Sequence, residues 1–117
     1  MVKKITIYHN PKCSTSKQVL EMIREAGHEP EVVEYLKAGW TKPKLKELLA
    51  AAGLTPRQAL RTKAAEAEAL GLLDPKVSDA KILDAMIAHP VLVERPFVVT
   101  AKRTLLARPK EKVREII

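Results

Sequence analysis

The sequence predicts an α/β fold in which a mixed sheet of about four strands has a block of helices inserted between its two halves. Three observations predict this fold class. The opening third has the pattern strand, helix, strand, with the length expected of two parallel strands joined by a crossover helix. The middle of the chain is helical in period, and the last part returns to two short strands and a final helix.

The opening third predicts a β-α-β unit. Lys4 to Tyr8 alternates apolar and polar residues and is rich in β-branched side chains, as a strand would be. Apolar residues then recur with a helical period from Ser14 to Ala26, and Gly27 ends this helix. Glu31 to Leu36 is again apolar and β-branched, which predicts the second strand.

A helical block follows, at about residues 41–89 of a single domain that we expect to cover residues 1–117. Its four predicted helices are rich in alanine and leucine: Lys42–Ala52, Pro56–Leu60, Ala64–Leu70 and Asp79–Ala88. Thr41, Thr55 and Ser78 stand where N-cap residues belong, and a proline follows each threonine at or near the first helical position.

The last part of the chain predicts a hairpin and a helix. Phe97–Thr100 and Thr104–Ala107 have the residues of two strands, separated by a short turn. Pro109 then opens a terminal helix, Lys110–Ile117. Together with the first two strands, the hairpin completes the predicted sheet.

The composition restricts the cellular setting. With 117 residues, 46% of them hydrophobic, the chain can bury a core without disulfides or a structural metal. Its one cysteine and the absence of zinc-ligand spacing favour a reducing compartment. No apolar stretch has the length of a signal peptide or a membrane span, so we expect a cytoplasmic protein, and a small basic domain of this kind is most simply a monomer.

The charge of the chain indicates an anionic partner. The formal net charge is +7, which is compatible with nucleic acid, a membrane surface or a small oxyanion. Aromatic residues make up only 3% of the chain and are scattered, and the basic residues are interleaved with 14 acidic ones. Neither feature favours a nucleic-acid interface, which needs a stacking platform or a basic patch.

Cys13 is the first candidate for chemistry. It lies where the first strand passes into the first helix, and a helix N-terminus favours the thiolate over the thiol. Ser14, Thr15 and Ser16 are small hydroxylated residues suited to a helix start, and their N–H groups and hydroxyls form a possible cradle for an anion. Two simpler interpretations stay open: a buried, inert cysteine and an ordinary helix cap.

His9 is the second candidate, four residues before Cys13 at the end of the first strand. As a cation or a hydrogen-bond donor it would favour the thiolate, and otherwise it is a solvent-facing polar residue. His28 and His89 have the sequence context of surface histidines.

Three arginines are candidates for binding an oxyanion, because the guanidinium fork matches tetrahedral oxyanions and stays charged. Arg61 follows a predicted helix, Arg95 precedes Pro96 and a strand, and Arg108 ends the last strand. Their position at the ends of elements is where sites tend to lie, although position alone also fits surface residues.

These residues together resemble the glutaredoxin- and glutathione-dependent arsenate reductases, within the thioredoxin-like fold. The matching stretches span nearly the whole chain: Ile5 to Pro11 with Cys13 and Thr15-Ser16, Leu20 to Arg24, Ala59 to Arg61, Gly71-Leu72, His89-Pro90, Arg95-Pro96 with Val98 to Thr100, and Arg108-Pro109. Two positions differ from the family pattern, since Ser14 stands where some members have glycine and Lys17 where many have arginine.

The resemblance implies roles for the candidate residues. Cys13 is implied to be the nucleophile, with His9 and Ser16 lowering its pKa. The implied oxyanion-binding residues are Arg61, Arg95, Arg108, Ser14, Thr15 and Asn10. The Arg95-Pro96 peptide is similar to the peptide that is cis in thioredoxin-like folds.

The resemblance also implies a reaction without a bound cofactor or metal. Cys13 attacks arsenate, glutathione as co-substrate attacks the adduct, arsenite leaves, and glutaredoxin resolves the mixed disulfide, with phosphate as a competitor. The lack of a second cysteine favours such an external thiol. One alternative is an Spx-like redox-responsive regulator that binds RNA polymerase, in which Ser16 would usually be a second cysteine. Another is a related reductase-like protein of unassigned substrate, which would keep the cysteine loop but lack the three arginines that this chain has.

Overall fold

The structure is a computed structural model that describes residues 4–117. The chain divides into two compact units. The first comprises the described residues up to Ala38 together with Arg95–Ile117, and the second is Gly39–Glu94. That the two units work as a single domain stays a prediction.

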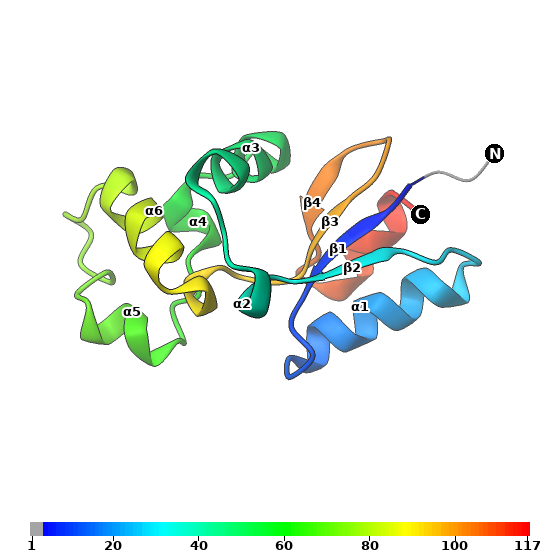
Figure 1. The fold of residues 1–117 in the computed structure, drawn as a ribbon, viewed down its shortest axis with the longest axis horizontal. Coiled ribbons are helices and arrows are strands. Elements are labelled where there is room, and N and C mark those ends of the chain that lie inside the picture. The colour runs from blue at the N-terminus through cyan, green and yellow to red at the C-terminus, as the bar shows by residue number, and fades with distance from the viewer. Residues whose placement is uncertain (1–3) are drawn as a thin grey trace. The chain divides into compact units, whose positions relative to one another are not determined.

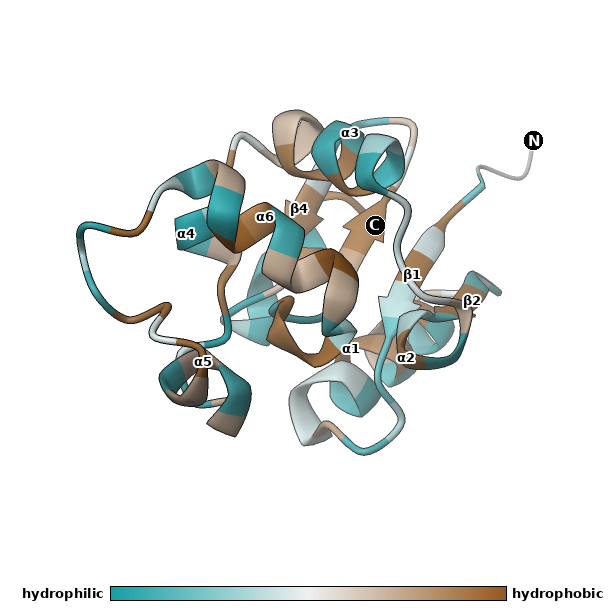
Figure 2. Cartoon of the chain, turned by 60° about the vertical axis from the view of Figure 1, so that its left-hand side comes forward, coloured by the Kyte–Doolittle hydropathy of each residue, from teal (hydrophilic) through white to brown (hydrophobic). Residues whose placement is uncertain are grey.

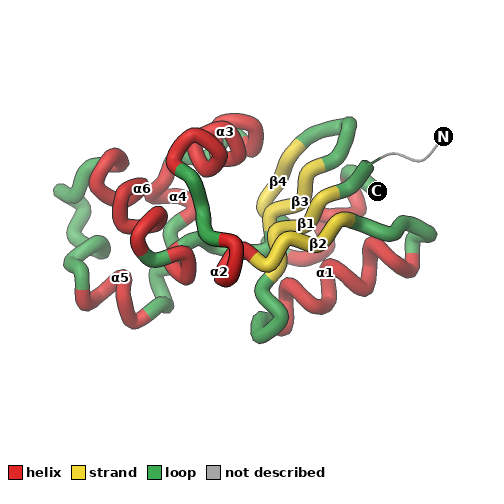
Figure 3. Tube along the Cα trace, in the orientation of Figure 1, coloured by secondary structure: helices red, strands yellow, loops and turns green. Residues whose placement is uncertain are grey.

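The first unit contains one four-stranded sheet, in which the strands lie side by side in the order β2-β1-β3-β4 (Figures 1 and 3). The strands are β1 (Thr6–His9), β2 (Glu31–Glu34), β3 (Phe97–Val99) and β4 (Thr104–Leu106). β1 pairs with β2 in parallel and with β3 antiparallel, and β3 and β4 form an antiparallel hairpin. The predicted mixed sheet of four strands is therefore confirmed.

Two helical elements cover one face of this sheet, α1 (Ser14–Glu25) and η2 (Lys110–Glu115) (Figure 1). The fully buried side chains of Ile7, Val19 and Val98 come from β1, α1 and β3 and form one hydrophobic core with Val113 of η2. α1 buries Val19 and Ile23 because residues four apart share a helix face. This packing fixes the start of α1, which carries Cys13, against the end of β1.

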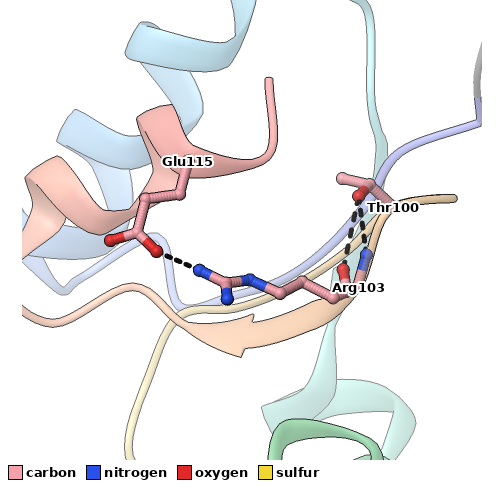
Figure 4. Close-up of polar contacts among 3 residues, drawn as sticks. All are labelled: Thr100, Arg103 and Glu115. Atoms are coloured by element: carbon pink, nitrogen blue, oxygen red, sulfur yellow. Dashed lines mark hydrogen bonds and ion pairs between the residues drawn. The ribbon is translucent and has the colours of Figure 1, made fainter.

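The hairpin and η2 are also joined at their outer ends. The Arg103 guanidinium forms an ion pair with the Glu115 carboxylate, and the Thr100 hydroxyl and the Arg103 backbone close the turn between β3 and β4 (Figure 4). Both charged side chains are about half exposed, so this pair contributes little to stability.

The second unit is helical. It contains α3 (Lys42–Ala52), α4 (Pro56–Ala59), α5 (Ala65–Ala69), α6 (Asp79–Ala88) and the short 3-10 helix η1 (Pro90–Leu92). The predicted N-caps are confirmed: the side chains of Thr41, Thr55 and Ser78 each accept a backbone N–H from the first turn. Figure 2 shows the hydrophobic stretch of α6, which includes the buried residues Ile82 and Met86.

Two predicted elements differ from the structure. Tyr35 and Leu36, expected in the second strand, begin the short helix α2 (Tyr35–Ala38), because β1 has ended at His9 and offers no further partner for strand pairing. The terminal element is a 3-10 helix rather than an α-helix. Its one buried residue, Val113, and the buried residue that ends it, Ile116, lie three apart, and the three-residue period of a 3-10 helix puts both on the core side.

The ends of the remaining elements lie within two residues of the predicted ones, which is the usual uncertainty of element boundaries. Among residues 4–117, no helix combines the length and the apolar character that crossing a membrane requires.

Candidate active site

The Cys13 loop connects β1 to α1. Cys13 is the N-cap residue of α1, with extended backbone angles of φ −93° and ψ 120°. Its N–H donates to the carbonyl of Asn10 at 3.0 Å, and its carbonyl accepts the N–H of Lys17 at 3.0 Å. These bonds hold Cys13, which is partly exposed, at the start of the helix.

The surroundings of Cys13 favour the thiolate. Burial by itself raises the pKa of the Cys13 thiol. The backbone N–H of Ser16, the guanidinium of Arg95 and the backbone N–H of Thr15 lower it, and together they outweigh burial, so the pKa lies below its ordinary value of 9.0. The sulfur makes no capping hydrogen bond to the first turn of α1. We therefore regard the two N–H groups as an electrostatic stabilisation of the thiolate by the helix start.

Arg95 is the arginine that the structure brings to Cys13. Its side chain is only 5% exposed, and it interacts with the thiol both by a hydrogen bond and by its charge. Arg108 lies beside it, since Nη1 of Arg108 donates to the carbonyl of Arg95 at 3.0 Å. The predicted cis peptide at Arg95-Pro96 is confirmed, and Arg108-Pro109 is also cis.

His9 and Ser16 form a buried polar network with Asn10. Nδ1 of His9 lies 2.6 Å from the Ser16 hydroxyl oxygen, which also accepts the N–H of Asn10 at 3.1 Å. All three residues are at most 6% exposed. The network joins the end of β1 to the first turn of α1 and thereby supports the loop that carries Cys13.

His9 favours its neutral form. Burial lowers the pKa of the His9 imidazole below 6.5, Glu34 raises it, and the charges of Arg24 and Lys17 lower it. A neutral imidazole cannot stabilise the thiolate as a cation, which was one of the two roles expected for His9. Its contact with Ser16 instead indicates that His9 holds the loop that carries Cys13 in place.

The sequence did not predict that Glu34 would lie near the candidate site. It lies directly opposite His9 in the parallel register of β1 and β2, and its charge acts on the imidazole. A parallel register places the two side chains on the same face of the sheet. The available signal was the predicted β-α-β unit, which makes the ends of its two strands neighbours.

The remaining loop residues have different surroundings. Asn10 uses its backbone carbonyl and its Oδ1 as acceptors for the N–H groups of Cys13 and Lys12, so only its side-chain amino group remains for the predicted oxyanion contact. Ser14 is exposed and Thr15 partly exposed, both in the first turn of α1. Their roles in oxyanion binding stay predictions.

Arg61 belongs to the second unit, whereas Cys13, Arg95 and Arg108 belong to the first. Nη1 of Arg61 lies 3.7 Å from Oε1 of Glu94, a residue that was also missed although it directly precedes Arg95. The structure thus brings Arg95 to Cys13 and the Arg108 side chain to the Arg95 backbone, and the shared oxyanion-binding role of Arg61 stays a prediction.

Metal ligands are not grouped in the part of the chain that the structure describes. Among residues 4–117, no three His, Cys, Asp or Glu side chains lie close enough to hold a metal ion together.

The sheet order and a cysteine at the start of the helix that follows β1 define a protein of the thioredoxin-like class. The sequence model of the ArsC family matches residues 8–116 of this chain. The chain belongs to the ArsC family.

Curated relatives and a solved structure agree with this assignment. The chain is 55% identical over 113 residues to the arsenate reductase ArsI2 of Synechocystis sp. (strain ATCC 27184 / PCC 6803 / Kazusa), which covers 97% of this chain and 81% of that protein. It is 45% identical over 116 residues to an arsenate reductase of Escherichia coli (strain K12), covering 99% of this chain and 82% of that protein. The structure of an arsenate reductase from Vibrio cholerae superposes with a TM-score of 0.93 at 37% identity over 100% of both chains.

Proposed function

We propose that this protein is an arsenate reductase that uses Cys13 as its nucleophile and external thiols as reductants. The observation that supports this proposal most directly is the position of Cys13 at the N-cap of α1, beside the buried side chain of Arg95. This position lowers the pKa of the Cys13 thiol through the N–H groups of Ser16 and Thr15 and through the Arg95 guanidinium. A thiolate next to a guanidinium combines a nucleophile with a binding group for its anionic substrate.

In the proposed first step, the Cys13 thiolate attacks the arsenic atom of arsenate. An S–As bond forms, an As–O bond breaks and the oxygen leaves as water after taking up protons. Arg95, Arg108 and Arg61 bind the oxyanion and offset the repulsion between it and the thiolate. Because the Arg108 side chain also holds the Arg95 carbonyl, it positions the segment that carries Arg95.

In the proposed second step, glutathione attacks the adduct. Arsenite leaves with the electron pair, so arsenic is reduced by two electrons while Cys13 and glutathione are oxidised to a mixed disulfide. Glutaredoxin then reduces this disulfide. The external thiols are proposed because these 117 residues contain one cysteine, so none of them can resolve the disulfide internally.

Arsenate, with phosphate as a competitor, is the proposed ligand, and the protein is proposed to act as a cytoplasmic monomer. Phosphate has the same shape and charge but offers the thiol no two-electron reduction. The Spx-like alternative is less favoured, because the position of its second cysteine is held by Ser16, whose hydroxyl contacts His9.

The proposal is tested by measuring arsenite formation from arsenate with glutathione and glutaredoxin. We expect turnover by the native chain and none by Cys13→Ser. Replacing glutaredoxin by thioredoxin or a mycoredoxin-like protein identifies the donor. If the native chain forms no arsenite with any of these donors, the proposal is wrong.

The arginines have a separate test. Arg95→Leu and Arg61→Leu should each lower kcat/KM for arsenate at least about tenfold, equivalent to about 1.4 kcal/mol of transition-state stabilisation. Arg103→Leu is the matched control, because Arg103 is half exposed and pairs with Glu115. If Arg61→Leu behaves like this control, Arg61 has no part in oxyanion binding.

A further inference from the structure

Glu94 forms an ion pair with Arg61 inside the second unit. Oε1 of Glu94 lies 3.7 Å from Nη1 of Arg61, and the two side chains are only 22% and 26% exposed. By contrast, the pair of Lys42 and Asp84 in the same unit is 52% and 63% exposed. Water and salt therefore screen the charge of Glu94 less than they screen a surface carboxylate.

The backbone brings this pair together. Leu60 and Val93 form an antiparallel bridge, and the N–H of Arg61 donates to the carbonyl of Leu92 at 2.8 Å. This register sets Arg61 opposite Leu92, and Glu94 is two residues further along the same strand-like segment. Residues two apart share a face, so Arg61 and Glu94 are diagonal neighbours within reach of long side chains.

The contact is an ion pair rather than a close hydrogen bond. A separation of 3.7 Å exceeds the usual N–H···O distance, so the attraction through these two atoms is mainly Coulombic. A carboxylate and a tetrahedral oxyanion are both anions that use oxygen atoms to contact a guanidinium. Both anions are attracted to the same positive charge. When one guanidinium binds both, the two anions lie close together and repel each other.

We propose that Glu94 is a positioning residue that competes with the bound oxyanion for the Arg61 guanidinium and thereby sets the affinity of the protein for tetrahedral oxyanions. This inference rests on the proposed oxyanion-binding role of Arg61. It concerns binding rather than the chemical step, because Glu94 acts through Arg61. Removing its charge should strengthen binding of phosphate and lower the KM for arsenate without raising kcat.

The test is the affinity for inorganic phosphate, measured by titration calorimetry on the full chain at fixed low ionic strength. Glu94→Gln keeps the size of the side chain and removes its charge, and we expect Kd to fall at least about threefold. Glu94→Ala should change Kd in the same direction, and Glu94→Asp, which keeps the charge, should stay within about twofold of the native value. Asp84→Asn is the matched control for net charge and should change Kd by less than about 1.5-fold.

A double-mutant cycle with Arg61 assigns the effect to the pair. In an Arg61→Leu background, Glu94→Gln should no longer tighten phosphate binding. The inference is overturned if Glu94→Gln leaves Kd unchanged, if Asp84→Asn tightens binding equally, or if the gain persists without Arg61. Phosphate binding needs no turnover, so a chain that forms no arsenite but shows this Glu94 effect would contradict the proposed reaction and support the inference.

Discussion

The Ser16 hydroxyl oxygen lies 2.6 Å from Nδ1 of His9, and this buried contact fastens the first turn of α1 to the end of β1. The same oxygen accepts the N–H of Asn10, while the backbone N–H of Ser16 faces the Cys13 sulfur. Ser16 therefore has two separable roles. Its hydroxyl holds the loop together, and its N–H stabilises the thiolate.

Replacing Ser16 by alanine should separate these roles. The change leaves the N–H of Asn10 and Nδ1 of His9 buried without their shared partner, and we expect it to lower the free energy of unfolding by about 1–3 kcal/mol in urea denaturation. Ser14→Ala is the control, since Ser14 is exposed and should change stability by less than about 0.5 kcal/mol. Because the N–H of residue 16 remains, the Cys13 pKa should stay below that of an ordinary thiol. Equal stability of the two variants would contradict the structural role of the hydroxyl.

Replacing Arg95 by leucine should raise the pKa of Cys13. The variant loses the hydrogen bond and the positive charge that the guanidinium provides to the sulfur, while the N–H groups of Ser16 and Thr15 remain. The measurement is a pH titration of the thiolate by ultraviolet absorbance. Arg103→Leu removes a positive charge from the same unit and should leave the titration unchanged. An unchanged thiol pKa in Arg95→Leu would show that the helix start alone lowers it.

The free energy of unfolding should decrease as the pH is lowered, because of His9. Its pKa is lowered in the folded protein, so the unfolded state binds more protons as the pH falls below 6.5. The stabilising contribution is complete above 6.5 and is lost as the pH falls toward the lower, folded-state pKa. Urea unfolding at about pH 7.5 and about pH 5.5 should therefore show a decrease in the free energy of unfolding.

The share of His9 in this decrease is obtained from variants. His9→Gln should make the decrease in the free energy of unfolding smaller. His89 is exposed at the end of α6, so His89→Gln is the control and should leave the decrease as in the native chain. Comparing the slopes with pH, rather than absolute stabilities, removes any constant effect of each substitution. Equal slopes in His9→Gln and the native chain would show that other groups cause the pH dependence.

The core of the first unit should respond strongly to a cavity in α1. Ile23 is fully buried against the sheet, and Ile23→Ala should lower the free energy of unfolding by about 2–5 kcal/mol in urea denaturation. Val32→Ala is the control, because Val32 is 37% exposed in the edge strand β2 and its loss should cost much less. A small effect of Ile23→Ala would mean that α1 is held mainly by other contacts.

Local patterns in the sequence determined the elements and the place of the cysteine. Alternation and β-branching predicted β1, helical periodicity predicted α3 and α6 with their bounds, and Thr41 and Ser78 predicted the caps that start them. Each of these signals acts between residues a few positions apart, which is why it is readable in one chain. The position of Cys13 at the start of α1 followed from the same local signals.

Only the tertiary structure decided which distant residues meet. The sheet order β2-β1-β3-β4 places the segment that precedes β3 beside the end of β1, and this brings Arg95 to Cys13 and Arg108 to Arg95. The parallel register sets Glu34 opposite His9, and the bridge between Leu60 and Val93 pairs Glu94 with Arg61. These contacts depend on backbone pairing between segments far apart in the chain, and no local pattern encodes such a register.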